Sequence, residues 1–402
     1  DGRALLLGEV IDTRQRRRDI QLKGSGRTPF SRGGDGLAAI GPVLREYLIG
    51  EAMHALGIPT TRALAAVATG KGVYREVPLP GAILTRVAAS HIRVGTFQYG
   101  AARGDFDKVR ALADYAMKRH YPDTFEAENP CLAFFAAVAD AQSALVARWM
   151  NIGFIHGVMN TDNMTISGET IDYGPCAFMD RYAAGTVFSS IDQNGRYAYA
   201  NQPEILIWNL TRLAETLIPF VDPDKDKAIE MLTEAIECIQ PVYESYWLVG
   251  MRSKIGLSKE DPADSQLIND LLKVMEEGQA DFTLVFHRLA QALRGDGEAV
   301  RNLFKEPEAF DTWAQRWKKR MEQDGVSAET SAQSMDRVNP IYIPRNHKVE
   351  EVLAAATNQQ DMTPFSKLLA VLSHPFDEIT GNEAYAEPAP VTNRPYRTFC
   401  GT

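Results

Sequence analysis

The sequence predicts an α+β protein with two lobes, a small β-rich lobe followed by a large helical one. Residues 3–23 alternate between apolar and polar side chains on either side of a turn, and similar short runs lie at 61–69 and 80–87, which is typical of strands. Apolar residues recur at helical spacing from about residue 105 onward. A length of 402 residues with 45% hydrophobic residues is sufficient for more than one hydrophobic core.

Four segments of the N-terminal part have the alternation expected of strands: 4–12, 19–23, 61–69 and 80–87. The first two are joined by a basic turn with four arginines between Arg14 and Arg18, which we interpret as a solvated turn. A Gly-Lys-Gly turn at residues 70–72 joins the other two. Lys23 closes the second strand.

A connector rich in Gly, Ser and Arg spans residues 24–36 and leads into a helix that we expect over residues 37–56. Asp35 is its candidate N-cap, and a Gly-Ile-Pro sequence ends it. Glu46 lies in the middle of this helix. A sheet crossed by one helix is the plan of a kinase small lobe.

Seven helices are expected in the second half of the chain, near 106–119, 128–152, 203–219, 224–250, 259–277, 279–294 and 308–323. Beyond about residue 326 Pro, Asn and polar residues dominate, with helix-like stretches at 349–355 and 364–372, so we expect an extended, partly mobile tail. The predicted domains are a small lobe over 1–98, a helical lobe over 99–326 and a C-terminal extension over 327–402. Because the chain starts without Met and runs directly into apolar residues, we expect the small lobe to be N-terminally incomplete.

Composition argues against several classes of protein. The net charge of −9 disfavours a nucleic-acid partner. The most apolar stretch, Leu132–Met150, is interrupted by charged and amide residues and falls short of the roughly 18 uninterrupted apolar residues of a membrane span, so we expect no membrane partner. Four cysteines without Cys-x-x-Cys spacing favour a reducing compartment.

The sequence HGVMNTDN at 156–163, followed by Asp-Tyr-Gly at 172–174, has the layout of a kinase catalytic loop and metal-binding motif. Asn163 and Asp172 keep the positions of the magnesium ligands, and both side chains offer the hard oxygens that Mg²⁺ prefers. Val158 replaces the aspartate that acts as the base in kinases. Asp162 is the only carboxylate in the loop, and we predict that it is the replacement base. The alternative is that these residues only form turns.

Basic residues ahead of this motif are candidates for binding phosphate. Lys23 can contact phosphate oxygens and pair with Glu46, as the corresponding residues of kinases do. Arg3, Arg86 and Arg93 have the planar donor sets that clamp phosphates. Each of these residues taken singly is also compatible with an ordinary surface charge.

Several long strings of this sequence resemble the selenoprotein O (SelO) family of pseudokinases, and the likeness runs from the first residue to Cys400. They are DGRALLLGE at 1–9, LKGSGRTPFSR at 22–32, GDG at 34–36, HGVMNTDNM at 156–164 and DYGPCAFMD at 172–180. The resemblance implies a protein-kinase-like fold and protein adenylylation, in which ATP binds in an inverted orientation and AMP passes to Ser, Thr or Tyr hydroxyls of protein substrates. ATP and Mg²⁺, with Mn²⁺ as an alternative, are the implied cofactors.

Residue matching to this family implies a complete set of roles. The implied ATP contacts are Gly2, Arg3, Lys23, Asp35, Gly36, Arg86, Arg93 and Asp172. Glu46 would pair with Lys23, Asn163 and Asp172 would hold the metal, and Asp162 would be the base. The resemblance also suggests redox control, with Cys400 near the C-terminus and Cys176 its most plausible disulfide partner.

Two other functions are compatible with the residues. One is a kinase for proteins or small molecules that uses an atypical base, and the other is a pseudokinase that binds ATP without catalysis. We expect a monomer in the bacterial cytoplasm, with the mitochondrial matrix as the alternative compartment.

Overall fold

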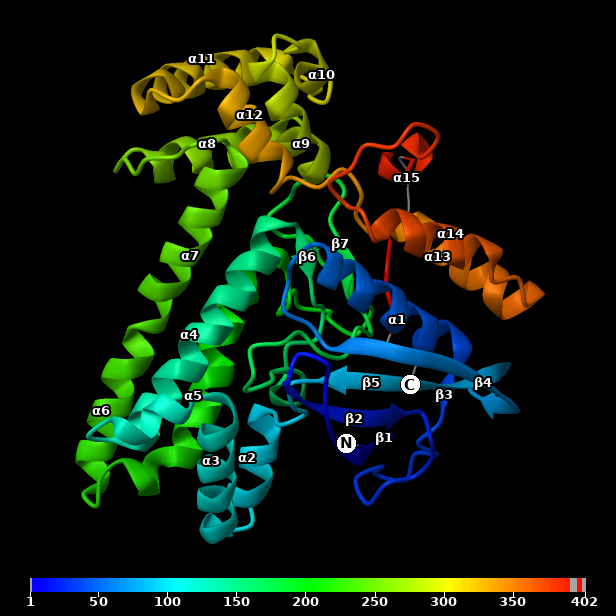
Figure 1. Ribbon diagram of the computed structural model, residues 1–402, viewed down its shortest axis with the longest axis vertical. Helices are drawn as coiled ribbons and strands as arrows, with labels where there is room; N and C mark the ends of the chain where they lie inside the picture. Colours follow the sequence, from blue (N-terminus) through cyan, green and yellow to red (C-terminus); the bar gives the residue numbers. More distant parts are fainter. Residues whose placement is uncertain (1, 391–395, 400–402) are drawn as a thin grey trace.

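The computed structural model describes residues 2–390 and 396–399 and has one main sheet followed by helices (Figure 1). The strands of this sheet are β1 (Ala4–Ile11), β2 (Arg17–Lys23), β3 (Ala38–Ala39), β4 (Arg62–Tyr74) and β5 (Pro78–Ala88). Their order is β1-β2-β5-β3 with β4 also paired to β5, and every pairing is antiparallel. The predicted α+β class is therefore confirmed.

β1 is an edge strand whose apolar side chains remain largely in solvent. Leu5, Leu6 and Leu7 are 50%, 52% and 57% exposed. The strand pairs along its whole length with β2, with one irregularity between Leu6 and Gly8. Within the described residues, the outer side of β1 has no partner strand.

The helix α1 (Ile40–Ala55) crosses the sheet and buries Leu48, Ile49 and Met53 against it and the helical part. The prediction that Asp35 caps this helix is wrong. Residues 38–39 pair with β5 as the short strand β3, so the helix begins later and Ala39 is its N-cap. Asp35 instead forms an ion pair with Arg75.

The turn predicted at residues 70–72 is also misplaced. β4 continues through these residues to Tyr74, with an irregular register between Ala68 and Gly72. Gly70 has a φ of 70°, which a glycine adopts without strain, so the chain bulges here and does not reverse. The reversal lies at residues 75–77.

The helices after the sheet are α2 (Val94–Ala101), α3 (Phe106–His120), α4 (Pro130–Asn151), α5 (Gln202–Val221), α6 (Lys225–Glu237), α7 (Ile239–Lys254), α8 (Asp264–Glu277), α9 (Phe282–Leu293), α10 (Glu298–Arg301) and α11 (Pro307–Asp324). Between α4 and α5 lies a small hairpin of β6 (Phe154–Ile155) and β7 (Ala177–Phe178). This hairpin holds the two ends of the loop region that carries the 156–163 and 172–174 motifs. The single helix predicted over 224–250 is two helices, because Pro241 fixes the first turn of α7 and disfavours a helix running continuously into it.

α4 is long and apolar enough to cross a membrane by length and composition alone, but 56% of its apolar window is buried inside the structure. It packs against α5 and α7 (Figure 1) and contributes Phe134, Phe135 and Val146 to the main core. A buried core helix satisfies the same criteria as a membrane span, so α4 is explained by its place in the core.

Beyond residue 326 the helix-like stretches expected at 349–355 and 364–372 are confirmed, but the expectation that the rest of this region is extended is wrong at residues 328–336 and 383–386. This region contains α12 (Ala328–Asp336), α13 (Asn346–Ala354) with a π-helical turn at Ala355–Gln359, α14 (Thr363–Leu372) and α15 (Glu383–Ala386). Arg345 is buried and pairs with Asp281 at 2.7 Å and with Asp180 at 2.7 Å, which joins the region to the helical part. Figure 1 shows α13 and α14 beside α1, on the side away from β1.

Candidate active site

A compact cluster of four charged side chains lies where the sheet meets the loop after β6. Lys23 Nζ lies 2.5 Å from Glu46 Oε2 and also contacts Asp172 Oδ1. Arg86 contacts Glu46 through Nε, and its Nη2 lies 2.8 Å from Asp172 Oδ1. The two cations and two carboxylates come from β2, α1, β5 and the loop, so this cluster fixes the relative position of all four elements.

The alternation of β2 explains how these charges come to lie inside the protein. Asp19, Gln21 and Lys23 are the buried residues of this strand, and the residues between them are less buried. Gln21 lies opposite Arg86 in the pairing with β5, and its Oε1 accepts a hydrogen bond of 3.3 Å from Arg86 Nη1. The inward face of β2 is therefore polar, which a search for apolar alternation does not detect.

The cluster keeps its carboxylates ionised. Burial opposes ionisation of Asp172, but the adjacent Lys23 and Arg86 outweigh it and hold the pKa of Asp172 well below its usual value. Burial likewise opposes ionisation of Glu46, and Arg86 and Lys23 lower the pKa of that carboxyl. Burial and the like charge of Arg86 lower the pKa of Arg93. An anion beside Arg93 would therefore stabilise its charged form.

His156 orients the loop from the protein interior. It is fully buried, and its Nε2 donates a hydrogen bond of 2.9 Å to the carbonyl oxygen of Ile171, the residue before Asp172. Burial lowers the pKa of His156, so the ring is neutral and acts as a donor to the backbone. Asp172 itself has a φ of 67°, a conformation that few non-glycine residues adopt.

Asn163 and Asp162 lie on the short 3₁₀ turn Thr161–Asn163. Asn163 Nδ2 donates to the carbonyl oxygen of Val158 at 2.9 Å, which leaves its side-chain oxygen available to a ligand. Asp162 is exposed, and its backbone carbonyl accepts a hydrogen bond of 3.0 Å from Arg93 Nη1. Val158, at the position of the kinase base, is buried and apolar.

A cavity of about 1630 Å³ brings most of the predicted site residues together. Its lining includes Gly2, Arg3, Asp35, Gly36, Arg93, Asp162, Asn163 and Asp172. Lys23 and Glu46 lie behind Asp172 and line a smaller cavity of about 510 Å³. Arg86 lines neither cavity, because it is enclosed between Glu46, Gln21 and Asp172.

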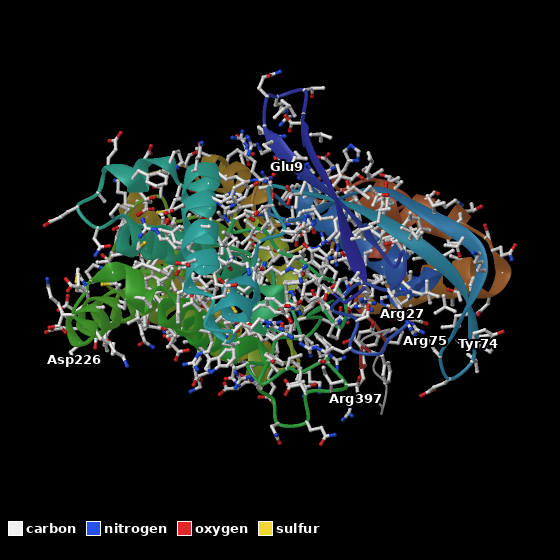
Figure 2. All side chains as sticks on the ribbon, turned by 90° about the horizontal axis from the view of Figure 1, so that it is seen from below. Glu9, Arg27, Tyr74, Arg75, Asp226 and Arg397 are labelled. Atoms are coloured by element: carbon white, nitrogen blue, oxygen red, sulfur yellow. The ribbon has the colours of Figure 1, made fainter. Side chains whose placement is uncertain are left out.

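The Gly-rich connector forms one wall of the larger cavity. Gly36 has a φ of 69°, and a side chain there would collide with the backbone of Gly26, which hydrogen-bonds to the carbonyl oxygen of Gly36 at 3.2 Å. Asp35 accepts hydrogen bonds from Arg75 at 2.8 and 3.2 Å. Arg27 and Arg75 both line the cavity, and Figure 2 shows them labelled close together near the strands.

Several residues of this cavity are not recognisable as site residues from the sequence. Arg75 and Arg103 line it but carry no local motif, since Arg75 meets Asp35 only through folding. The helix α2 was also missed, and it supplies Gly95 and Tyr99 to the wall. The glycines of this short helix weaken its helical pattern in the sequence.

Of the two cysteines in the redox hypothesis, the structure describes Cys176 but not Cys400. Cys176 is fully buried, and burial raises the pKa of its thiol to about 12. Cys400 lies outside the described residues. Thr398 Oγ1 donates to the carbonyl oxygen of Pro175 at 2.6 Å, so the described end of the tail passes beside the residue that precedes Cys176.

The donor set is compatible with Mg²⁺ held together with a nucleotide. The described residues contain no group of three or more His, Cys, Asp or Glu side chains suited to a metal. Mg²⁺ commonly takes only one or two protein oxygens and completes its shell with phosphates and water. Asn163 and Asp172 both reach the larger cavity and offer that number of ligands.

Comparison with known proteins identifies relatives along the whole chain. A family model described as "Protein adenylyltransferase SelO" matches residues 1–373. A protein of Cereibacter sphaeroides named "Protein nucleotidyltransferase YdiU" is 60% identical over 404 residues, which cover 100% of this chain and 82% of that protein. Proteins of the same name from Rhizobium leguminosarum bv. trifolii and Rhizobium meliloti are 58% and 57% identical over 405 residues, covering 100% of this chain and 81% and 82% of theirs.

The matched length and identity settle what the motifs suggested, and the resemblance in the sequence is confirmed. The chain belongs to the SelO family of protein adenylyltransferases.

Proposed function

We propose that this protein transfers AMP from ATP to Ser, Thr or Tyr hydroxyls of protein substrates. The observation that carries the proposal is the larger cavity, in which Asp162, Asn163 and Asp172 meet the basic residues Arg3 and Arg93 while Val158 occupies the kinase base position. This arrangement offers metal ligands, phosphate-binding cations and one exposed carboxylate, which is the set required for nucleotidyl transfer.

In this proposal Asp162 accepts the proton of the acceptor hydroxyl, directly or through one water, as that oxygen attacks the α-phosphorus. The bond from the α-phosphorus to the bridging oxygen breaks, and pyrophosphate leaves. Asn163 and Asp172 would hold Mg²⁺, with Mn²⁺ as the alternative, which neutralises phosphate charge. Gly2, Arg3, Asp35, Gly36 and Arg93 would contact ATP from the cavity wall.

Lys23 and Arg86 contact Asp172 from the protein interior. Their contacts with this carboxylate, and with Glu46, set its position and charge. Lys23 would contact the phosphates of the nucleotide beside Asp172. Arg86 would add to the positive electrostatic potential at the same phosphates. ATP would lie inverted relative to kinases, as the resemblance to the SelO family implies, with its α-phosphate near the metal site and close to Asp162.

We also propose a protein-kinase-like arrangement of two lobes, with a monomer in the bacterial cytoplasm. The small sheet crossed by α1 and the helical remainder, with the cavity between them, support this arrangement. A disulfide between Cys176 and Cys400 would reduce activity by holding the tail over this region.

The test is to incubate the purified protein and Mg²⁺ with a protein extract and ATP labelled on either the α- or the γ-phosphate. Label on denatured protein from the α-position, absent with Asp172→Ala, is the expected result. Label only from the γ-position would make the protein a kinase with an atypical base. No label from either position would favour a pseudokinase that binds ATP without catalysis.

A further inference from the structure

The first turn of α2 lies against the loop turn that carries Asp162. Figure 1 shows α2 between the sheet and α3. A carbon atom added to Gly95, the second residue of α2, would meet Asp162 Oδ1 at a distance that real side chains do not show, and would lie 3.3 Å from the carbonyl oxygen of Thr161. The carboxylate therefore occupies the space that any side chain at Gly95 would need.

The two segments cannot easily move apart, because backbone hydrogen bonds join residues 92–94 to residues 164–166 next to this contact. Val94 N donates to the carbonyl oxygen of Met164 at 3.0 Å, and Ile166 N donates to that of Ile92 at 3.1 Å. Arg93 pairs with Thr165 as an antiparallel bridge. These bonds fix the start of α2 relative to the turn that precedes Met164.

Gly95 does not owe its identity to an unusual backbone conformation. Its φ lies outside the left-handed region in which glycine is favoured, and alanine is a better helix former at such a position. The nearest atoms outside α2 to an added Cβ belong to Asp162 and Thr161. The space at Gly95 is thus matched to the Asp162 side chain.

We propose that Gly95 is a positioning residue for Asp162: its missing side chain lets the carboxylate lie across the first turn of α2, facing the cavity. This inference rests on the proposed function, in which Asp162 is the base. A general base must come within hydrogen-bond reach of the proton that it removes, and displacement by about 1 Å can cost roughly a hundredfold in rate.

The experiment compares Gly95→Ala, Asp162→Ala and the double variant in the full chain, using transfer of AMP from α-labelled ATP. Gly95→Ala should lower kcat by about tenfold to a hundredfold with the KM for ATP changed less than about threefold, because the methyl group displaces the base. The double variant should be no slower than Asp162→Ala, because the two changes act through one group. Gly297→Ala, where nothing lies within 4 Å of the added carbon, is the matched control and should keep full activity.

Thermal unfolding of the same variants separates misfolding from displacement. If the collision in Gly95→Ala lowers the melting temperature, the double variant should regain it, since the carboxylate is gone. A Gly95→Ala protein with the wild-type kcat would overturn the inference, as would a double variant slower than Asp162→Ala by the full Gly95→Ala factor. If Asp162→Ala itself keeps the wild-type rate, the assignment of the base fails and the inference fails with it.

Discussion

At the scale of single residues, the site combines one exposed carboxylate with a set of buried charges. Asp162 is exposed at the cavity, whereas Glu46 and Arg86 are enclosed. This division assigns different roles to residues of similar chemistry: the exposed carboxylate can exchange protons with a substrate, and the enclosed groups hold the geometry.

Asp162→Asn should lower kcat for AMP transfer by about a hundredfold or more, because general-base catalysis contributes roughly 10² to 10⁴ in rate. Binding of Mg²⁺ and ATP should be nearly unchanged, since the proposed metal ligands Asn163 and Asp172 remain. Steady-state kinetics and calorimetric titration with a non-hydrolysable ATP analogue measure the two quantities. A variant that keeps at least half of the wild-type kcat would exclude Asp162 as the base.

Arg86→Met should reduce the free energy of unfolding by about 3 kcal/mol, because it removes one partner from a buried charge cluster. Burial opposes ionisation of Glu46, but Arg86 and Lys23 lower the pKa of its carboxyl in the folded protein. The stabilisation that the ionised Glu46 gives to the fold is therefore complete above its ordinary pKa of 4.5 and is lost as the pH falls through the lower pKa of the folded state. The difference in the free energy of unfolding between the wild type and Arg86→Met should therefore become smaller at acidic pH. Urea unfolding at several pH values tests this.

The control for that experiment is Arg110→Met, which removes a surface ion pair with Asp114 at 2.9 Å. Surface pairs contribute about 0 to 1 kcal/mol. Equal losses in the two variants would mean that the buried cluster stabilises the fold no more than a surface pair does.

At the scale of elements, α7 ends in a lysine that the protein surrounds completely. Lys254 Nζ lies 2.9 Å from Asn339 Oδ1 and 4.3 Å from the centre of the Phe286 ring. Burial lowers the pKa of Lys254 to about 7. The lysine thus joins α7, α9 and the segment after α12 in a neutral or weakly charged state near neutral pH.

From pH 7 to about 10 the unfolded chain binds a proton at Lys254 that the folded chain does not, since the ordinary pKa is 10.5. Stability should therefore rise with pH in this window by about 1.4 kcal/mol per unit from this group. Lys254→Met should remove that slope and be more stable at pH 7. Parallel pH dependences for the two proteins in urea unfolding would show that Lys254 does not titrate as expected.

The tail passes beside the segment that carries Cys176, so the proposed disulfide between Cys176 and Cys400 would act on the relation between these two elements. AMP transfer by the wild type should increase on addition of a thiol reductant, and Cys400→Ser should be equally active with and without it. Cys238→Ser, which changes an exposed thiol after α6, is the control and should keep the response. No change in the wild type on reduction would contradict the disulfide.

Elements were predicted correctly from the sequence where an apolar periodicity continued over many residues. Their bounds were missed where contacts with residues distant in sequence decide the structure. α4 and α5 were expected close to their observed bounds because their apolar periodicity is long. The start of α1 was misjudged because the sheet takes residues 38–39 first. The contacts of Asp35 with Arg75 and of Asp162 with Gly95 join residues far apart in sequence, and no local pattern encodes them.

At the scale of the whole molecule, one large cavity gathers residues from the first strand, the connector, α2 and the loop after β6. Mg²⁺ with ATP at a hundred times its dissociation constant should raise the free energy of unfolding by about 2.7 kcal/mol. Asp172→Ala should show a much smaller increase, because it lacks one of the two proposed metal ligands. Urea unfolding with and without Mg²⁺ and ATP measures the effect, and equal increases would remove Asp172 from the metal site.

The contacts of Asp172 with Lys23 and Arg86 also bear on the order in which ligands arrive. A bare divalent ion must compete with two cations that already neutralise this carboxylate, and it gains little by doing so. The phosphates of a nucleotide bring enough negative charge to offset the positive charges of the ion, Lys23 and Arg86 together. The metal should therefore enter as a complex with its nucleotide, and the resting protein carries its own counterions until that complex arrives.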